Sequence, residues 1–282
     1  MSYPQFEDSV DSGKPLYFYE FIYGDAATNA YRYVAALDLT IYGGRPWTPF
    51  PIKHSEIVTS GSLDKQTLTV TAREDIDITG LVVTRAPSRV TTLNIYRGHA
   101  GDDDMRMIWS GRVLSGNMVE TSEVELACES ISTSQLNIGL RRKYQRGCPH
   151  ALYGRACSAD KSLHSESGSS TSVANSMSVS VTLTSEDRGL TEATLTGGIF
   201  RITLKNGLTE IRAISSAVNN GGRNWTLNII APISDMTAGR PVSVSKGCLH
   251  TYDACKNVFN NADNYGGCAN IPTKNPFNAN QF

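Results

Sequence analysis

Short stretches in which apolar and polar residues alternate run through most of the chain, and turn residues separate them roughly every eight to twelve positions. This spacing is typical of the strands of β-sandwiches and β-barrels. Long stretches with the 3.6-residue period of an α-helix are absent from the sequence. The pattern therefore predicts a mainly β protein.

The first part of the chain, residues 1–135, is expected to form a multi-stranded β body. Its strands are predicted at residues 16–23, 31–35, 37–42, 68–72, 81–85, 90–97, 105–114 and 118–130. Residues 47–52 contain two prolines, which lack the N–H that a central strand needs, so an extended edge segment or a loop is expected there. Cys128, in the last strand, is expected to be a buried structural thiol.

A second set of strands is expected to form a small β-barrel or sandwich, inserted into the chain over residues 159–245. Five strands are predicted, at residues 179–184, 199–204, 210–218, 225–230 and 241–244. The pair Asn206–Gly207 is typical of a type I′ hairpin turn. The serine-rich stretch at residues 158–172 is predicted to be a flexible connector.

Two matched cysteine segments flank the predicted inserted domain: residues 147–157, the first clip, and residues 247–255, the second clip. Each begins Gly–Cys–x–His, carries a tyrosine a few residues later and ends on a second cysteine. Four sulfurs in two matched segments usually indicate one closed site. The predicted ligands are Cys148, Cys157, Cys248 and Cys255.

The clips are expected to lie in a small irregular lobe made of residues 136–158 and 246–282. Residues 251–261 have the spacing of a short C-terminal helix within this lobe. The predicted architecture is thus a β body, an inserted β domain and a cysteine lobe that joins the two ends of the insertion.

The spacing of the cysteines bears on what they could hold. Eight residues separate Cys148 from Cys157, and six separate Cys248 from Cys255, whereas a zinc knuckle has two. The wider spacing suits a larger inorganic body, such as an iron–sulfur cluster, whose ligands stand further apart than those of one ion. A zinc site in which His150 or His250 replaces a thiol stays open as an alternative, as does a pair of disulfides.

Other groups near the clips are candidates for supporting roles. His150 and His250 occupy equivalent places and are expected to donate hydrogen bonds to ligand sulfur atoms. Cys268 is expected to be a spare buried thiol, or the substitute ligand if one of the four is wrong. Cations that could offset the negative charge of a thiolate-bound cluster, or serve only as solubilising charges, are Arg142, Lys143, Arg146, Arg155, Lys246 and Lys256.

Composition narrows the class of protein. Hydrophobic residues make up 40% of the chain, charged residues 19%, and the formal net charge is -1, as in ordinary globular proteins. Near-neutrality argues against a nucleic-acid-binding protein, and no apolar run approaches the roughly 18 residues of a membrane span. The N-terminal residues are polar and acidic, so no secretory signal is expected and the thiols should stay reduced in a cytoplasm.

Sequence motifs do not point to an enzyme. Patterns of the P-loop, GxGxxG, GxSxG and HExxH types are absent. Four matched cysteines also leave no open position for a substrate, so a structural role is expected. A soluble iron–sulfur electron-transfer protein and a zinc-stabilised binding module remain as alternatives.

The order Cys-x₈-Cys then Cys-x₆-Cys, after an all-β body containing Trp–Thr–Pro–Phe–Pro–Ile, resembles the tail-tip hub proteins of long-tailed phages. That family includes minor tail protein L of lambda-like phages and the hub proteins of gene transfer agents. Residues 44–56 are similar to its early extended motif, residues 195–248 to its inserted β domain and residues 255–272 to its terminal motif.

This resemblance implies a [4Fe–4S] cluster held by the four clip cysteines. It also implies a homotrimeric ring, a baseplate hub at the tail tip of the virion, assembled in the cytoplasm of the bacterial host. The partners would be the tail tube with its distal ring protein on one side and the central fibre or receptor-binding protein on the other. Residues 47–52 and 271–282 are the expected ring contacts, because extended segments without a core of their own often pack on a partner.

Overall fold

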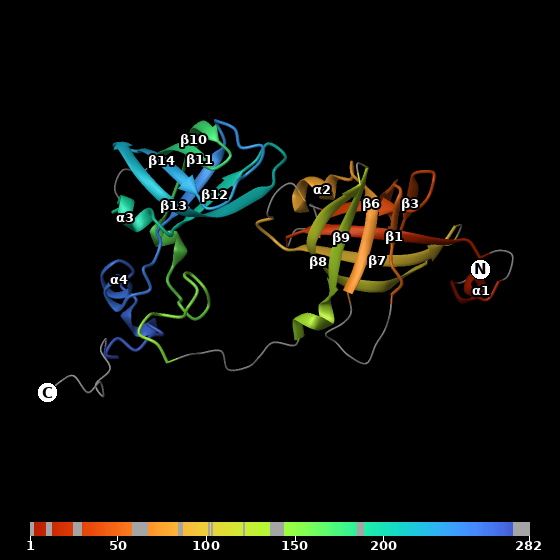
Figure 1. Cartoon of the computed structure of the whole chain (residues 1–282), viewed down its shortest axis with the longest axis horizontal. Coiled ribbons are helices and arrows are strands. Elements are labelled where there is room, and N and C mark those ends of the chain that lie inside the picture. Colours follow the sequence, from red (N-terminus) through yellow and green to blue (C-terminus); the bar gives the residue numbers. More distant parts are fainter. Residues whose placement is uncertain are drawn as a thin grey trace. The chain divides into compact units, whose positions relative to one another are not determined.

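The computed structural model describes residues 3–9, 13–24, 30–57, 67–83, 87–100, 102, 104–120, 122–135, 144–184 and 189–272. Strands dominate this part of the chain, as the alternation predicts. The chain folds into two compact units, Met1–Ile138 and Gly139–Phe282 (Figure 1). The finer division of the second unit into a lobe and an inserted domain stays a prediction.

The first unit is built on one sheet of nine strands, in the order β3-β4-β2-β1-β7-β8-β9-β6-β5. The strands are β1 (Pro15–Tyr23), β2 (Ala30–Val34), β3 (Thr40–Tyr42), β4 (Arg45–Pro49), β5 (Ile52–His54), β6 (Thr67–Arg73), β7 (Thr91–His99), β8 (Met105–Glu120) and β9 (Glu123–Ser130). Neighbours pair antiparallel except β2 and β4, which are parallel. Among the described residues, β3 and β5 are therefore the two ends of the sheet.

The core of the first unit follows from the alternation. In β6 the buried positions are Leu68, Val70 and Ala72, and the residues between them face outward. Trp47 of β4 is fully buried, with its ring centroid 5.1 Å from that of Phe18 in β1. Cys128 in β9 is 1% exposed, as predicted, and burial raises the pKa of its thiol to about 12.

Three predictions for the first unit are wrong. The single strand expected at residues 118–130 is the end of β8 followed by β9, and the two pair antiparallel. Residues 77–82 form the helix α2 (Asp77–Val82), where a strand was expected from residue 81. Ile78 and Leu81, three residues apart, are both buried on one side of α2, and a short apolar run does not distinguish such a helix from a strand. The strand β4 lies between β3 and β2, not at an edge. Its pairing with β2 covers only two residue pairs, so its prolines cost few ladder hydrogen bonds.

The short helix α1 (Tyr3–Glu7) packs against β7 through one histidine. The His99 ring is 1% exposed and lies 5.4 Å from the ring of Tyr3 and 5.6 Å from that of Phe6, centroid to centroid. Its Nε2 lies 3.0 Å from Glu7 Oε1, and Arg97 Nη2 lies 3.1 Å from Glu7 Oε2. The hydrogen bond from His99 is the main reason that the pKa of Glu7 is lowered.

Attachment of α1 is expected to weaken in acid. Because the pKa of Glu7 is lower in the folded protein, its stabilising contribution is present above the ordinary carboxyl value and is lost as pH falls through the lowered one. The protection against hydrogen exchange of the amides of Asp8 and Ser9, which donate to Pro4 O and Phe6 O, should fall over that range in the parent protein and much less in Glu7→Gln. The exposed Glu56→Gln serves as a control that keeps the parent behaviour. Equal pH dependence in parent and Glu7→Gln would contradict this assignment.

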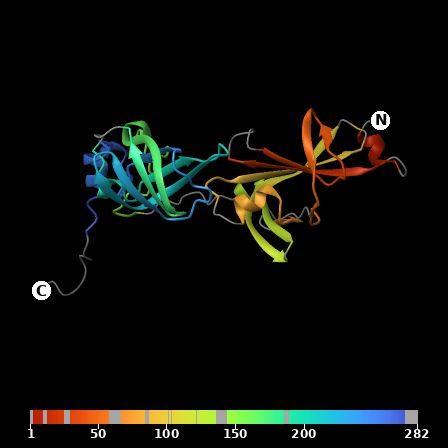
Figure 2. The same cartoon turned by 90° about the horizontal axis from the view of Figure 1, so that it is seen from above.

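The second unit contains a closed barrel of six strands in the order β10-β11-β14-β13-β12-β15 (Figures 1 and 2). The strands are β10 (Ser165–Asn175), β11 (Ser178–Leu183), β12 (Ile199–Thr203), β13 (Thr209–Gly221), β14 (Asn224–Ile229) and β15 (Pro241–Ser245). Their inward residues form one apolar core in which Phe200 and Leu227 are fully buried. The five strands predicted in this region are confirmed, and α3 (Glu192–Leu195) lies between β11 and β12.

The sixth strand overturns the prediction of a flexible connector at residues 158–172. A 3₁₀ turn, Lys161–His164, leads into β10, which closes the barrel between β11 and β15. Gly168 passes so close to β11 that a Cβ there would lie 2.3 Å from the Thr182 carbonyl oxygen. Backbone hydrogen bonds to strands on both sides, and not apolar side chains, hold this serine-rich strand in the barrel. Its amino-acid composition therefore does not identify it as a strand.

The hairpin predicted at Asn206–Gly207 joins β12 and β13, but its turn is not of type I′. Leu204 N–H donates to Leu208 O (2.8 Å), and only Gly207 of the pair has a positive φ, +80°. A type I′ turn needs positive φ at both central residues. Asn206 instead accepts a hydrogen bond from Leu208 N–H at its side-chain oxygen (3.0 Å), which favours a wider turn.

Candidate functional site: the cysteine lobe

The two clips meet in space although about one hundred residues separate them. Cys148 N–H donates to His250 O (2.8 Å), and Nδ1 of the His250 ring donates to Cys148 O (3.0 Å). This reciprocal pair joins the first cysteine of the first clip to the histidine of the second clip. The two clips are therefore held together by backbone and side-chain hydrogen bonds.

Backbone donors surround the sulfur atoms of the site. His250 N–H donates to Cys248 Sγ (3.3 Å), and Gly266 N–H donates to Cys148 Sγ (3.4 Å). The side-chain amide of Asn261 lies 3.9 Å from Cys157 Sγ, while Cys255 Sγ donates to the carbonyl oxygen of Asn261 (3.0 Å). Hydrogen bonds of this kind tune and stabilise thiolate ligands.

The four predicted cysteines act on one another electrostatically. Burial, followed by the charges of Cys248, Cys148 and Cys157, raises the pKa of the Cys255 thiol. The pKa of Cys248 is raised by burial and, less strongly, by Cys157 and Cys148, against the lowering effect of the His250 N–H. All six cysteines lie in the described part of the chain and carry free thiols. The thiols of the four clip cysteines thus lie near enough for their charges to interact, and no disulfide joins them, while their role as ligands stays a prediction.

Local sequence explains how Cys255 is positioned. The helix α4 (Tyr252–Asn257) begins directly after Thr251, whose side chain accepts a hydrogen bond from Ala254 N–H (3.2 Å). Thr251 is thus an N-cap, which stabilises the first turn of a short helix. Cys255 and Phe259 are each 7% exposed, whereas Tyr252 is 39% exposed. The predicted short helix is confirmed, and Tyr252 is its outward aromatic residue.

Residues 265–268, which we call the strap, lie against the backbone of the first clip and the residues just before it. Gly267 passes so close that a Cβ there would lie 2.5 Å from Arg146 O and 2.7 Å from Gly147 O. Cys268 N–H donates to Gln145 O (2.9 Å), and Tyr265 Oη donates to Arg146 O (2.5 Å). The contact of the strap with the first clip is not among the predictions from the sequence, where the pair Gly266–Gly267 is its only signal.

The supporting residues differ from expectation. Nδ1 of His150 donates to Asn264 O (3.1 Å) and that of His250 to Cys148 O, so both rings bind carbonyls, and only the backbone of His250 reaches sulfur. Of the candidate cations, Lys246 is 8% exposed. Arg146, Arg155 and Lys256 are exposed. Arg142 and Lys143 lie outside the described residues, as do residues 273–282 of the expected tail contact.

A cluster of rings joins the lobe to the base of the barrel. The ring centroid of His164 lies 4.8 Å from that of Phe259 and 6.5 Å from that of Tyr153. Tyr153 Oη donates to Lys246 O (2.8 Å), at the point where β15 leaves the barrel. The cysteine site is therefore anchored to the barrel by packing as well as by the chain.

The donor chemistry of the site suits a cofactor bound by thiolates. Two of the four clip thiols, those of Cys248 and Cys148, already accept backbone N–H donors. Within the described ranges, no three His, Cys, Asp or Glu side chains are placed to hold a metal ion as they stand. The thiols would therefore draw closer together around any group that they bind.

Comparisons with known proteins bear on the fold. A family model described as "Phage conserved hypothetical protein BR0599" matches residues 194–275, which include the second clip and Cys268. One chain of a solved structure, "Virion of native gene transfer agent (GTA) particle", matches with a TM-score of 0.75 and 15% identity, over 97% of this chain and 93% of that one. The protein has the fold of that virion chain. No curated protein matched it.

Both matches agree with the expected likeness to phage and gene-transfer-agent proteins and with the expected place in a virion. The structural match spans both units, so the likeness is not confined to the cysteine lobe. Within the described chain, no helix has the length and apolarity to cross a membrane.

Proposed function

We propose that the protein is a structural component of a phage-type tail tip. The observation that carries this proposal is the fold shared with a gene-transfer-agent virion chain over nearly the full length of both chains. The phage family model over residues 194–275 supports it independently. A protein of this kind acts by shape and contact, which agrees with the absence of catalytic motifs from the sequence.

In the finer form of the proposal, the chain forms a homotrimeric baseplate hub. This ring joins the tail tube and its distal ring protein to the central fibre or receptor-binding protein. Its support is the cysteine spacing, which resembles that of the hub family, together with a fold match that includes both units. The protein is then a connector and not an enzyme.

The cysteine lobe is proposed to hold a structural [4Fe–4S] cluster through Cys148, Cys157, Cys248 and Cys255. When bound, the group would supply four metal–thiolate bonds that cross-link the two clips. The chain contributes the N–H donors of His250 and Gly266, which offset negative charge on sulfur. Four protein ligands would leave no open iron for a substrate, so the role is mechanical.

Metal content and mass test the two parts of this proposal on full-length protein purified without oxygen. We expect about four iron and four sulfide per chain, broad absorbance near 400 nm and a trimer in solution. One zinc per chain without sulfide would favour the zinc-stabilised module. A monomer whose cluster cycles reversibly between redox states would favour the electron carrier.

A further inference from the structure

The free edge of β5 offers hydrogen-bonding groups to a further strand. Ser55 N–H donates to Thr69 O (2.8 Å), and the register pairs Lys53 with Thr71. Hydrogen-bonded and non-bonded pairs alternate in an antiparallel ladder, so the N–H and C=O groups of Ile52 and His54 point away from β6. The order of the described strands ends there, which leaves these groups on an open edge.

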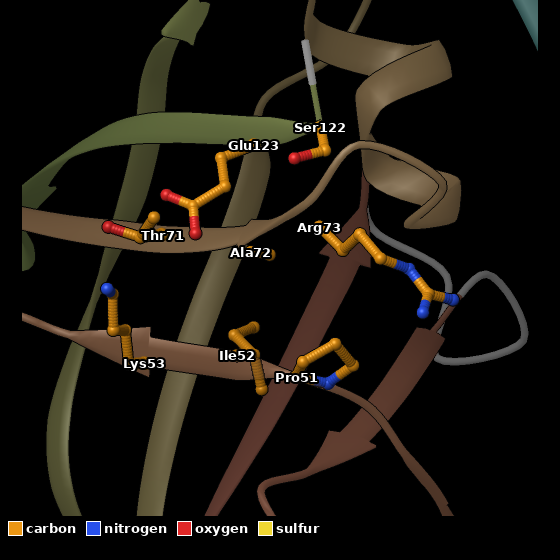
Figure 3. Close-up of a pocket in the computed structure, with 8 residues that line it drawn as sticks. All are labelled: Pro51, Ile52, Lys53, Thr71, Ala72, Arg73, Ser122 and Glu123. Atoms are coloured by element: carbon orange, nitrogen blue, oxygen red, sulfur yellow. The ribbon is translucent and has the colours of Figure 1, made fainter. Parts of the chain in front are cut away.

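Two hollows flank this edge and share Ile52 and Lys53. The first, of about 420 Å³, has Lys53 at one end and Arg73 at the other, with Pro51 and Ile52 between them (Figure 3). The second, of about 550 Å³, is lined by Tyr17, Tyr19 and Ile108 among others. A strand added beside β5 would thus have space for its side chains on both faces of the sheet.

The other end of the sheet carries uncovered apolar side chains. Leu37, Leu39 and Ile41, which we call the ridge, are 96%, 65% and 71% exposed. Only Thr40–Tyr42 of this segment is a strand, and residues 35–38 bend. If residues 37–42 extend as one strand, the alternation with Asp38 and Thr40 directs all three ridge side chains to one face. Three large neighbouring apolar residues left in water are typical of a contact surface.

The edge of β3 beyond the ridge is also open. β3 pairs with β4 alone, and Ile41 stands opposite Pro46, which has no N–H to give. The backbone groups of Ile41 are therefore turned to the outer edge. The exposed Asp38 beside the ridge is opposite in charge to the exposed Lys53 on β5.

We propose that residues 37–42 of a second copy of this chain add as a strand to the free edge of β5. The ridge then enters one of the two hollows beside Ile52, and Asp38 of one copy meets Lys53 of the next. Two different ends of one sheet make the contact, so it runs head to tail. Repeated copies then form a ring where the rotation from copy to copy closes, and an open filament where it does not. This inference rests on the proposed ring for its setting but is independent of the cluster.

Variants of the full-length protein test the contact by light scattering after size exclusion. Ile41→Asp and Leu39→Asp should each weaken self-association at least ~10-fold, because they place a charge in an apolar contact. Val218→Asp, at a 48% exposed barrel position, is the matched control and should leave self-association unchanged. Circular dichroism shows whether each variant is folded. If Ile41→Asp is misfolded, the result for Leu39→Asp decides, because Leu39 lies outside β3.

A charge exchange tests the pairing itself. Asp38→Lys and Lys53→Asp should each weaken association several-fold, and the double variant should restore it. If the parent protein forms a ring and the ridge and charge variants form it equally well, the proposed contact between β5 and residues 37–42 is refuted, whereas the proposed function is not. If the parent stays monomeric at all concentrations, both the contact and the ring are wrong. A reciprocal pair of copies would overturn the head-to-tail arrangement.

Discussion

Replacing Cys248 by serine is expected to empty the cysteine site and loosen the lobe. Serine is a poor ligand for iron, and Cys248 lies where the second clip pairs with the first through the hydrogen bonds between Cys148 and His250. A structural metal centre can supply several kcal/mol to the folding of a small lobe. We expect iron to fall from about four to below one per chain and the lobe to unfold well before the barrel.

Iron analysis and hydrogen exchange resolved by residue measure these two effects. The matched control is Cys128→Ala, since Cys128 is buried in the other unit and should retain full iron despite some loss of stability. Cys268→Ser separates a spare thiol from a ligand, because it should retain iron if the four clip cysteines are the full set. Normal assembly and infectivity of particles carrying Cys248→Ser would refute the structural role.

Gly267→Ala is expected to detach the strap from the first clip. The added Cβ would lie 2.5 Å from Arg146 O, 2.7 Å from Gly147 O and 2.8 Å from Gly147 C, all of them backbone atoms that cannot turn aside. Forcing such an overlap apart costs on the order of 2–4 kcal/mol in the free energy of unfolding. The N–H of Cys268, which donates to Gln145 O, should exchange faster as a result.

Gly147→Ala is the matched control on the opposite side of the same contact. A Cβ at Gly147 would have His250 O as its nearest neighbour, at the ordinary distance of 3.7 Å. Its cost should therefore stay below about 1 kcal/mol. Equal unfolding midpoints for the two variants in denaturant would show that the strap does not depend on this close approach.

Strands with apolar residues at alternate positions could be predicted from the sequence, and those without them could not. β14 and β11 place Trp225, Leu227, Val179 and Val181 in the barrel core at every second residue. β10 buries Glu166 and Ser170 in place of large apolar side chains, so only its partners identify it as a strand. The helix α2 was missed for the opposite reason, because its short apolar run fits both kinds of element.

The cysteine site also has parts that could be predicted from the sequence and parts that could not. Cysteines are rare and chemically distinct, so two matched clips could be recognised and their convergence expected. The hydrogen-bond donors to the sulfur atoms are the backbone N–H groups of His250 and Gly266. Every residue except proline has such a group, so the sequence does not show which residues serve as donors. The strap also depends on a close backbone approach at Gly267, and sequence alone does not tell which glycine serves contact and which serves a turn.

The barrel leaves the cysteine lobe and returns to it at a single point. β10 and β15, its first and last strands, are hydrogen-bonded neighbours, and Ser165 Oγ lies 2.7 Å from Ser245 Oγ. The two ends of the barrel therefore meet the cysteine lobe about one strand spacing, ~4.8 Å, apart. At the same place the ring of His164 packs on Phe259, and Gly247 N–H donates to Thr194 O. A domain that replaced the barrel would have to supply these contacts as well as two adjacent ends.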